Sequence, residues 1–253
     1  DRSPNVLFIL ADQHRWDFAG WETNGWTSTP NLDRLGREGA ILRRAYCPAP
    51  LCCPARDAIA AGRHGMNTGC FTNLHQLPAG TPTFAAQFRR AGYRTCALGK
   101  THMEIHAYDS DLTSGAHRQY MASLGWDEIL EVSGGCMFTT GIRCAYSEFL
   151  RRRGALRRVA DFYAHWHYFM DAGRQADHPF VCHPWTLEPE LQETTFLGDA
   201  AVAWLERRPA DRPFLLHLGF PGPHSPTEPH PEFLERYRDR EEPLPRGEAP
   251  VPT

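Results

Sequence analysis

Cys52 opens the run Cys-Cys-Pro-Ala-Arg, in which proline stands two positions and arginine four positions after the first cysteine. Pro54 near the start and Gly62 at the end favour a helix over this stretch, with Cys52 at its N-terminus. The helix dipole lowers the pKa of a thiol at that end, and the thiolate is a nucleophile or a redox centre. The spacing therefore indicates a reactive cysteine.

Two further candidate residues, Asp12 and Gln13, directly follow the apolar run from Val6 to Ala11. Their oxygen atoms suit a hard cation such as Ca²⁺, Mg²⁺ or Mn²⁺ better than zinc. The alternative interpretation is that Asp12 only caps a turn. The position of the pair at the end of an expected strand keeps the metal hypothesis open.

Strand-like and helix-like segments alternate along the chain, and these elements must position the reactive side chains. Apolar patterns predict strands at 5–11, 93–98 and 214–220, the first of them typical of a fully buried strand, and an extended segment at 40–46. Proline, threonine and glycine signals predict helices at 30–38, 52–61, 83–91 and 195–207, with a further helix around 161–170. Residues from about 103 to 190 are expected to form an irregular insertion.

This alternation predicts an α/β fold, a three-layer sandwich in which helices flank a largely parallel mixed sheet. Ligands of such sheets bind outside the carboxyl ends of the strands. Asp12, Lys100 and His224 each follow an expected strand, and Cys52 opens an expected helix. We therefore expect these four side chains at one edge of the sheet.

The composition bounds the class of protein. The 253 residues are 42% hydrophobic and 23% charged, which suits one large globular domain or two and excludes disordered, collagen-like and coiled-coil chains. A formal net charge of −3 gives no global basic field to attract nucleic acid or anionic lipid. The longest apolar run is too short to cross a bilayer. The chain starts at Asp1, so the compartment stays open: cytoplasmic, or periplasmic or secreted after removal of a leader.

The stretch LCCPARDAIAAGRH resembles the signature of the sulfatase family, in which the cysteine of CxPxR is oxidised after translation to formylglycine. Four further stretches resemble the other motifs of this family, in the family's order: NVLFILADQ, TPNLDRLGREGA, GYRTCALGKTHM and FLLHLGFPGPHSP. On these motifs the chain is similar to the formylglycine-dependent sulfatases, which belong to the alkaline phosphatase superfamily. The resemblance implies the fold of that superfamily.

The resemblance also implies a metal site and a maturation step. Asp12 and Gln13 would bind the divalent cation, most often Ca²⁺ in this family with Mg²⁺ or Mn²⁺ as alternatives, together with an oxygen of the modified Cys52. A formylglycine-generating enzyme would carry out that modification. It would therefore be a partner of this protein.

Roles for five more residues follow from the same resemblance. Arg56 would orient and stabilise the hydrated formylglycine. Lys100, the only lysine in the chain, and His102 would hold sulfate oxygens and hydrogen-bond the nucleophile. His224 would contact the sulfate and the leaving-group oxygen, acting as a general acid when protonated, and Asn73 would contribute an amide on the substrate side.

The chain also departs from the family. Sulfatases carry a downstream DHG-like motif with two more metal ligands and a second sulfate-binding lysine, and neither is found in this sequence. We therefore expect residues 1–253 to be the N-terminal, C-terminally incomplete part of a single sulfatase catalytic domain, and two explanations stay open: a fragment of a longer protein, or a shortened member of the family.

The expected activity is hydrolysis of a small-molecule or carbohydrate sulfate ester. Two alternatives stay open: a phosphonate monoester or phosphodiester hydrolase of the same superfamily, and a catalytically silent fragment. Lys100 and His102 favour sulfate esters. The substrate and the oligomeric state are not predicted.

Overall fold

A single parallel sheet organises the protein. The computed structural model describes residues 3–23, 25–171 and 182–240. Within these residues the sheet has the order β1–β4–β2–β3, and every neighbouring pair is parallel. Its strands are β1 (Val6–Asp12), β2 (Arg94–Gly99), β3 (Glu128–Glu131) and β4 (Phe214–Pro223).

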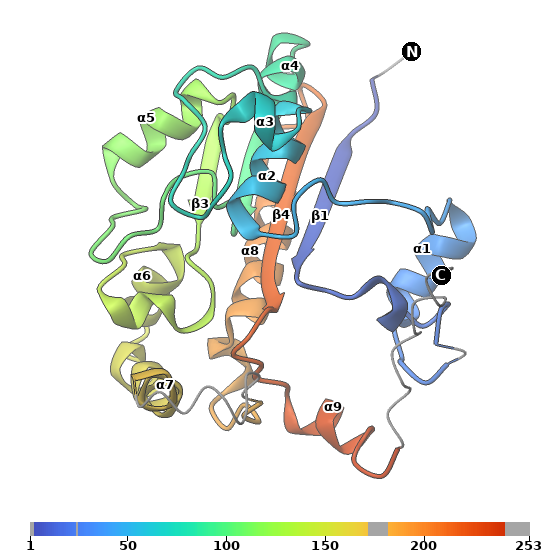
Figure 1. The fold of residues 1–253 in the computed structure, drawn as a ribbon, viewed down its shortest axis with the longest axis vertical. Helices are drawn as coiled ribbons and strands as arrows, with labels where there is room; N and C mark the ends of the chain where they lie inside the picture. Colours follow the sequence, from blue (N-terminus) through green and yellow to red (C-terminus); the bar gives the residue numbers. More distant parts are fainter. Residues whose placement is uncertain (1–2, 24, 172–181, 241–253) are drawn as a thin grey trace, which may run out of the picture.

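Helices lie on both faces of this sheet (Figure 1). One face is covered by α2 (Cys52–Ala61), α4 (Phe84–Arg90) and α5 (Gly115–Ser123), with α3 (Gly65–Thr68) packed on α2. The other face is covered by α6 (Ala145–Arg152), α7 (Leu156–Asp171) and α8 (Glu193–Arg207). Two further helices, α1 (Pro30–Glu38) and α9 (Pro231–Glu235), lie away from the sheet in Figure 1. The predicted sandwich with a parallel sheet is confirmed. Each helix in the described part of the chain is too short or too polar to span a membrane.

Local signals account for the ends of the helices. The Thr83 hydroxyl accepts a hydrogen bond of 3.0 Å from the backbone N–H of Ala86 and so caps α4. Pro30 occupies the first turn of α1, where its missing N–H costs nothing. Gly62 ends α2 in the left-handed conformation with φ +62°, and its N–H donates to the carbonyl of Ala58.

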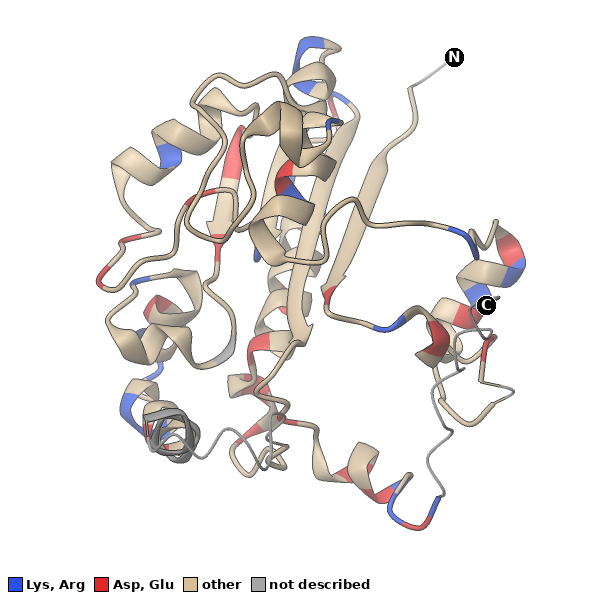
Figure 2. Ribbon diagram, in the orientation of Figure 1, with Lys and Arg blue, Asp and Glu red and all other residues tan. Residues whose placement is uncertain are grey.

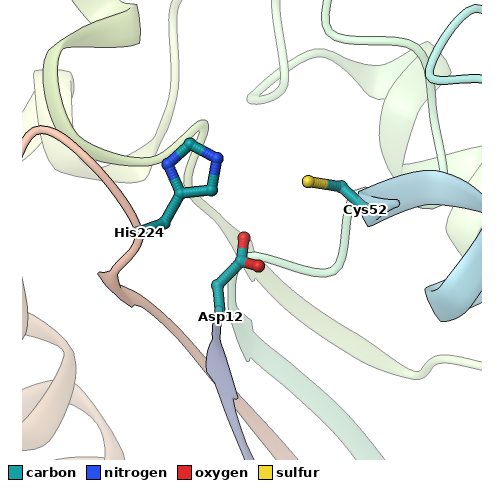
Figure 3. A group of neighbouring side chains, drawn as sticks. All are labelled: Asp12, Cys52 and His224. Carbon is teal, nitrogen blue, oxygen red and sulfur yellow. The ribbon is translucent and has the colours of Figure 1, made fainter. Parts of the chain in front are cut away.

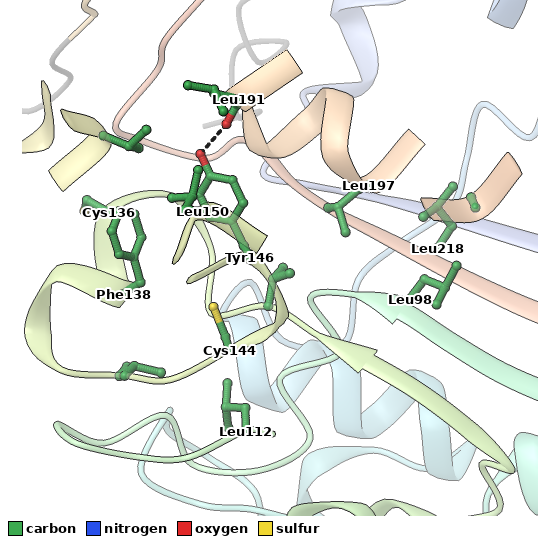
Figure 4. Close-up of a cluster of buried hydrophobic side chains, with 14 of the residues drawn as sticks. Leu98, Leu112, Cys136, Phe138, Cys144, Tyr146, Leu150, Leu191, Leu197 and Leu218 are labelled. Atoms are coloured by element: carbon green, nitrogen blue, oxygen red, sulfur yellow. Dashed lines mark hydrogen bonds between the residues drawn. The ribbon is translucent and has the colours of Figure 1, made fainter. Parts of the chain in front are cut away.

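The buried apolar residues form one cluster on each face, and β4 contributes to both. Leu215 belongs to the cluster under α2, α4 and α5, and its neighbour Leu216 to the cluster under α6, α7 and α8, because successive strand residues point to opposite faces. Figure 4 shows the second cluster, in which the Tyr146 hydroxyl donates to the carbonyl of Leu191 at 2.7 Å. Both layers of helices are thus anchored on one central strand.

Three sequence-based expectations are corrected by the structure. The strand at the N-terminus is an edge strand rather than a fully buried one, since Leu7 and Ile9 are each 49% exposed. Residues 40–46 form no strand, because apolar side chains favour a strand only where a partner strand and a packing surface are present. The segment 103–190, expected to be irregular, contains β3 and α5 to α7 within its described residues.

Candidate active site

The ends of three strands meet at one edge of the sheet. Asp12 is the last residue of β1, Lys100 follows β2, and His224 follows β4. The strands are parallel, so their carboxyl ends point the same way. The backbone N–H of Lys100 donates to the carbonyl of Gly219 on β4 at 2.8 Å, which holds the start of the loop against the neighbouring strand.

Asp12 is the centre of a cluster of charges. Its Oδ2 lies 2.5 Å from Nζ of Lys100 and 3.4 Å from a terminal nitrogen of Arg56, both of them buried cations. Arg56 also donates to the backbone carbonyl of Lys100. Burial by itself would raise the pKa of the Asp12 carboxyl, but the charge and hydrogen bond of Lys100 lower it below its usual value. Figure 2 shows an acidic residue where β1 ends and residues of both signs on α2.

Cys52 is the first residue of α2, and it points into this cluster. One ligand atom each from Asp12, Cys52 and His224 lies within 4.8 Å of the others (Figure 3). A hydrogen bond with His224 lowers the pKa of the Cys52 thiol below its usual value, and the charge of Lys100 adds to this effect. The same hydrogen bond raises the pKa of His224. Nδ1 of His224 donates to the carbonyl of Ser225 at 2.6 Å, which leaves Nε2 for the thiol.

His102 reaches the site through an unusual backbone conformation. Its φ is +52°, in the left-handed region that residues with a Cβ seldom adopt. Its ring stacks on that of His106, with 4.3 Å between the centroids. Burial, followed by the positive charges of Lys100 and Arg56, lowers the pKa of His102 to about 3. His102 is therefore a neutral imidazole at physiological pH.

Asn73 and Gln13, predicted to contact the substrate and the metal, have surroundings that the sequence did not indicate. The side-chain oxygen of Asn73 accepts a hydrogen bond of 3.0 Å from the backbone N–H of Cys53, so this amide satisfies one of the free N–H groups at the N-terminus of α2. Gln13 is exposed and has a φ of +62°. The roles of Asn73 at the substrate and of Gln13 at the metal stay predictions.

Two residues near the site were not singled out from the sequence. Glu131, the last residue of β3, accepts hydrogen bonds from Thr101 and from the backbone of His102. His106 stacks on His102, and its Nε2 lies 3.7 Å from Oε1 of Glu131. No motif marks either residue, because their partners are defined by the pairing of β2 with β3 and not by spacing along the chain.

The donor atoms at the strand ends fit part of a hard-cation site. Asp12 offers a carboxylate, and an oxygen in place of the Cys52 sulfur would give a second hard ligand. A Ca²⁺ ion takes six to eight oxygen ligands, as a rough rule. Among the residues described, Asp12 is the sole carboxylate in this three-residue group. The site thus supplies some of the ligands that such an ion needs.

Comparison with known proteins identifies the relatives of this arrangement. A family model described as Sulfatase matches residues 4–250. An arylsulfatase of Clostridium perfringens is 29% identical over 250 residues, which are 96% of this chain and 48% of the relative. The chain spans about half the length of the curated relatives it matches.

Solved structures agree at the level of the fold. A protein in complex with its substrate D-glucosamine-2-N,6-O-disulfate has a TM-score of 0.63 at 19% identity, over 96% of this chain and 39% of that chain. A phosphonate monoester hydrolase from Silicibacter pomeroyi has a TM-score of 0.61 at 26% identity, over 91% of this chain and 44% of that chain. The predicted alkaline phosphatase-like fold is confirmed.

Proposed function

The chain belongs to the sulfatase family, and on that premise we propose that it hydrolyses sulfate esters through a formylglycine made from Cys52. The observation that carries the proposal is that Cys52, Asp12 and His224 lie close together at one edge of the sheet. The ammonium group of Lys100 contacts Asp12 at the same edge. A nucleophile, two fixed cations and an imidazole are the groups that transfer of an anionic sulfuryl group requires.

Two groups must be added to the chain for this chemistry. As a hydrated formylglycine, residue 52 would present two hydroxyls on one carbon. One would attack sulfur while the bond from sulfur to the ester oxygen breaks and the alcohol leaves, and loss of the proton of the other would then release sulfate and restore the aldehyde. A divalent cation, for which the oxygen donors suit Ca²⁺, would be held by Asp12 and residue 52 and would lower the pKa of the attacking hydroxyl.

The residues of the chain perform the remaining tasks. Lys100 and Arg56 are buried and fixed, so their charges stabilise the developing negative charge on the transferred group without reorganising. His224 is exposed, and because its Nδ1 donates to the carbonyl of Ser225, its Nε2 can donate a proton to the leaving oxygen. His102, held neutral, can exchange hydrogen bonds with the nucleophile or the sulfate without adding charge.

The test uses the whole gene product, co-expressed with a formylglycine-generating enzyme. Peptide mass spectrometry should show that the Cys52 thiol has become an aldehyde, and the protein should then release para-nitrophenol from para-nitrophenyl sulfate. Chelation with EDTA should abolish turnover, and added Ca²⁺, Mg²⁺ or Mn²⁺ should restore it. Cys52→Ala is the control without a nucleophile. A fully converted protein that cleaves no aryl, choline or sugar sulfate would refute the proposal.

A second candidate is hydrolysis of phosphonate monoesters, favoured by the structural neighbour with that activity. Parallel measurement of kcat/KM on para-nitrophenyl sulfate and on para-nitrophenyl phenylphosphonate separates the two reactions. We expect the sulfate to be preferred, because Lys100 and His102 stand on the loop that resembles the sulfatase motif. An unmodified Cys52 after co-expression would instead support the catalytically silent alternative.

A further inference from the structure

The loop after β2 carries Lys100 and His102 into the site, and Glu131 contacts it at three points. Oε1 of Glu131 accepts the backbone N–H of Thr101 at 2.8 Å and that of His102 at 3.1 Å, while Oε2 accepts the Thr101 hydroxyl at 2.7 Å. The Glu131 side chain is fully buried. Both carboxylate oxygens are thus committed to two consecutive residues of one loop.

The strand register brings these groups together. Glu131 pairs with Gly99 in the parallel ladder between β2 and β3, so its side chain starts beside the point where the loop begins. On the opposite side the loop is held by β4, where the carbonyl of Gly219 accepts from Lys100. The loop is therefore fixed between two strands, by backbone on one side and by a side chain on the other.

This fixation matters most at His102, whose φ of +52° is disfavoured for a residue with a Cβ. Such a conformation persists only where surrounding contacts impose it. The hydrogen bond from the His102 N–H to Glu131 acts directly on that residue. Without it, relaxation of His102 to negative φ would turn its ring away from the site and shift the backbone next to Lys100.

We propose that Glu131 is a positioning residue, which holds Thr101 and His102 so that Lys100 and His102 face residue 52. The inference rests on the proposed sulfatase function, since it assigns the purpose of the loop to that reaction. Glu131 acts through the loop and does not touch the reacting atoms.

The contacts define what a substitution must keep. Oε1 accepts both backbone amides, and the amide oxygen of a glutamine can do the same. The glutamine NH₂ can donate to the Thr101 hydroxyl, which is also an acceptor. Glu131→Gln therefore preserves the three contacts without the charge, whereas Glu131→Leu fills a similar volume and removes all of them.

The experiment compares these variants in the matured full-length enzyme. We expect Glu131→Gln to keep kcat within about 3-fold of wild type, and Glu131→Leu to lower kcat by about 100-fold, as for misplaced catalytic groups, with a smaller change in KM. Hydrogen exchange of the peptide that contains Thr101 and His102 should be unchanged in Glu131→Gln. In Glu131→Leu it should be at least about tenfold faster.

Glu128→Leu is the matched control. Glu128 lies at the start of the same strand, and its carboxylate accepts a hydrogen bond of 3.1 Å from the Trp204 indole. Its substitution therefore removes a carboxylate from β3 that does not contact the loop. It should leave both kcat and the exchange of the loop unchanged. Thr101→Val, which removes a single contact, should give an intermediate effect and serves if Glu131→Leu does not fold.

The outcomes separate the two proposals. Exchange and kcat unchanged in Glu131→Leu, or in Thr101→Val where only that variant folds, would overturn the positioning role. A Glu131→Gln variant as impaired as Glu131→Leu would also overturn it, because the acceptor geometry would then not be what matters. Hydrogen exchange needs no turnover, so a wild-type protein inactive on every ester would refute the sulfatase function while the exchange result still decides the role of Glu131.

Discussion

Asp12 receives two cations at one carboxylate oxygen, and this contact organises the charges of the site. Lys100 and Arg56 approach it from different elements, the loop after β2 and helix α2. Removal of one member of a buried ion pair leaves the others unbalanced, which is more costly than the pair is worth by itself. The arrangement also keeps the Lys100 ammonium next to Cys52, whose pKa it helps to lower.

Lys100→Met removes this charge and keeps most of the side-chain volume. We expect kcat/KM for para-nitrophenyl sulfate to fall by about 100- to 1000-fold, because a fixed cation at the transferred group is lost. Lys100→Arg is the matched control. This variant keeps the positive charge on a planar guanidinium group, whose length and geometry differ from those of the ammonium. It should therefore recover part of the lost kcat/KM. Equal activity of Lys100→Met and wild type would contradict a role in charge stabilisation.

Glu228 makes the stability of the protein depend on pH. Burial raises the pKa of this carboxyl from 4.5 to about 7, and the Tyr163 hydroxyl donates to its Oε1 at 3.0 Å. The folded state holds the proton more tightly than the unfolded state between these values. The contribution of Glu228 to the free energy of unfolding is therefore complete below pH 4.5. It is lost as the pH rises through about 7, and the loss is at most about 3 kcal/mol.

Glu228→Gln cannot ionise and should remove this dependence. Urea unfolding at pH 5 and pH 8 is expected to show that the variant gains stability over wild type at the higher pH only. Glu232→Gln, at an exposed position of α9, is the control and should behave as wild type at both values. An equal difference at the two pH values would show that ionisation of Glu228 is not the cause.

At the scale of elements, the end of β2 determines where the loop enters the site. Gly99 has a φ of +92°, and an added Cβ would lie 2.0 Å from the carbonyl oxygen of Gly219. Real Cβ atoms never approach a backbone oxygen so closely, so β2 or β4 would have to move. The close approach of the two strands is thus a condition for the hydrogen bond between Lys100 and Gly219.

Gly99→Ala should destabilise the protein by about 3 kcal/mol or more, through backbone strain and displacement of a central strand. Gly92→Ala is a close control. Gly92 also has a positive φ, +87°, but its added Cβ would meet nothing within 4 Å, so the cost should be about 1 kcal/mol. Thermal unfolding measures both, and similar losses in the two variants would mean that the contact with Gly219 is not limiting.

At the scale of the whole molecule, the sheet is covered unevenly. Strand β4 lies between β1 and β2 and carries apolar side chains into the clusters on both faces. Strand β1 is at the edge, and Leu7 and Ile9 alternate with better covered residues. Stability should therefore depend far more on β4 than on β1, although both strands deliver residues to the site.

This difference predicts the outcome of four substitutions. Leu215→Ala and Leu216→Ala, each at most 1% exposed, should each cost about 2–5 kcal/mol. Leu7→Ala and Ile9→Ala, at half-exposed positions, should each cost about 1 kcal/mol or less. Chemical denaturation of the chain of residues 1–253 gives all four values. A loss at Leu7 equal to that at Leu216 would show that β1 is covered in solution.

Local signals explain what was predicted of this protein from its sequence. The helix that begins at Cys52 follows from Pro54 and Gly62, and the strands that end at Asp12, before Lys100 and before His224 follow from short apolar runs. Because parallel strands share one carboxyl edge, the types and order of these residues were enough to place them together. The family motifs name the same residues, so the family and the fold class were accessible without coordinates.

Only the tertiary structure decided the contacts that cross between elements. Glu131 meets Thr101 and His102 because β3 pairs with β2 in one register, and Asn73 meets the N-terminus of α2 because a distant loop returns there. The exposure of Leu7 and Ile9 likewise depends on which neighbour β1 has in the sheet. A sequence determines local conformation through short-range sterics and periodicity. Register and strand order depend on the packing of the whole chain, and no local pattern encodes them.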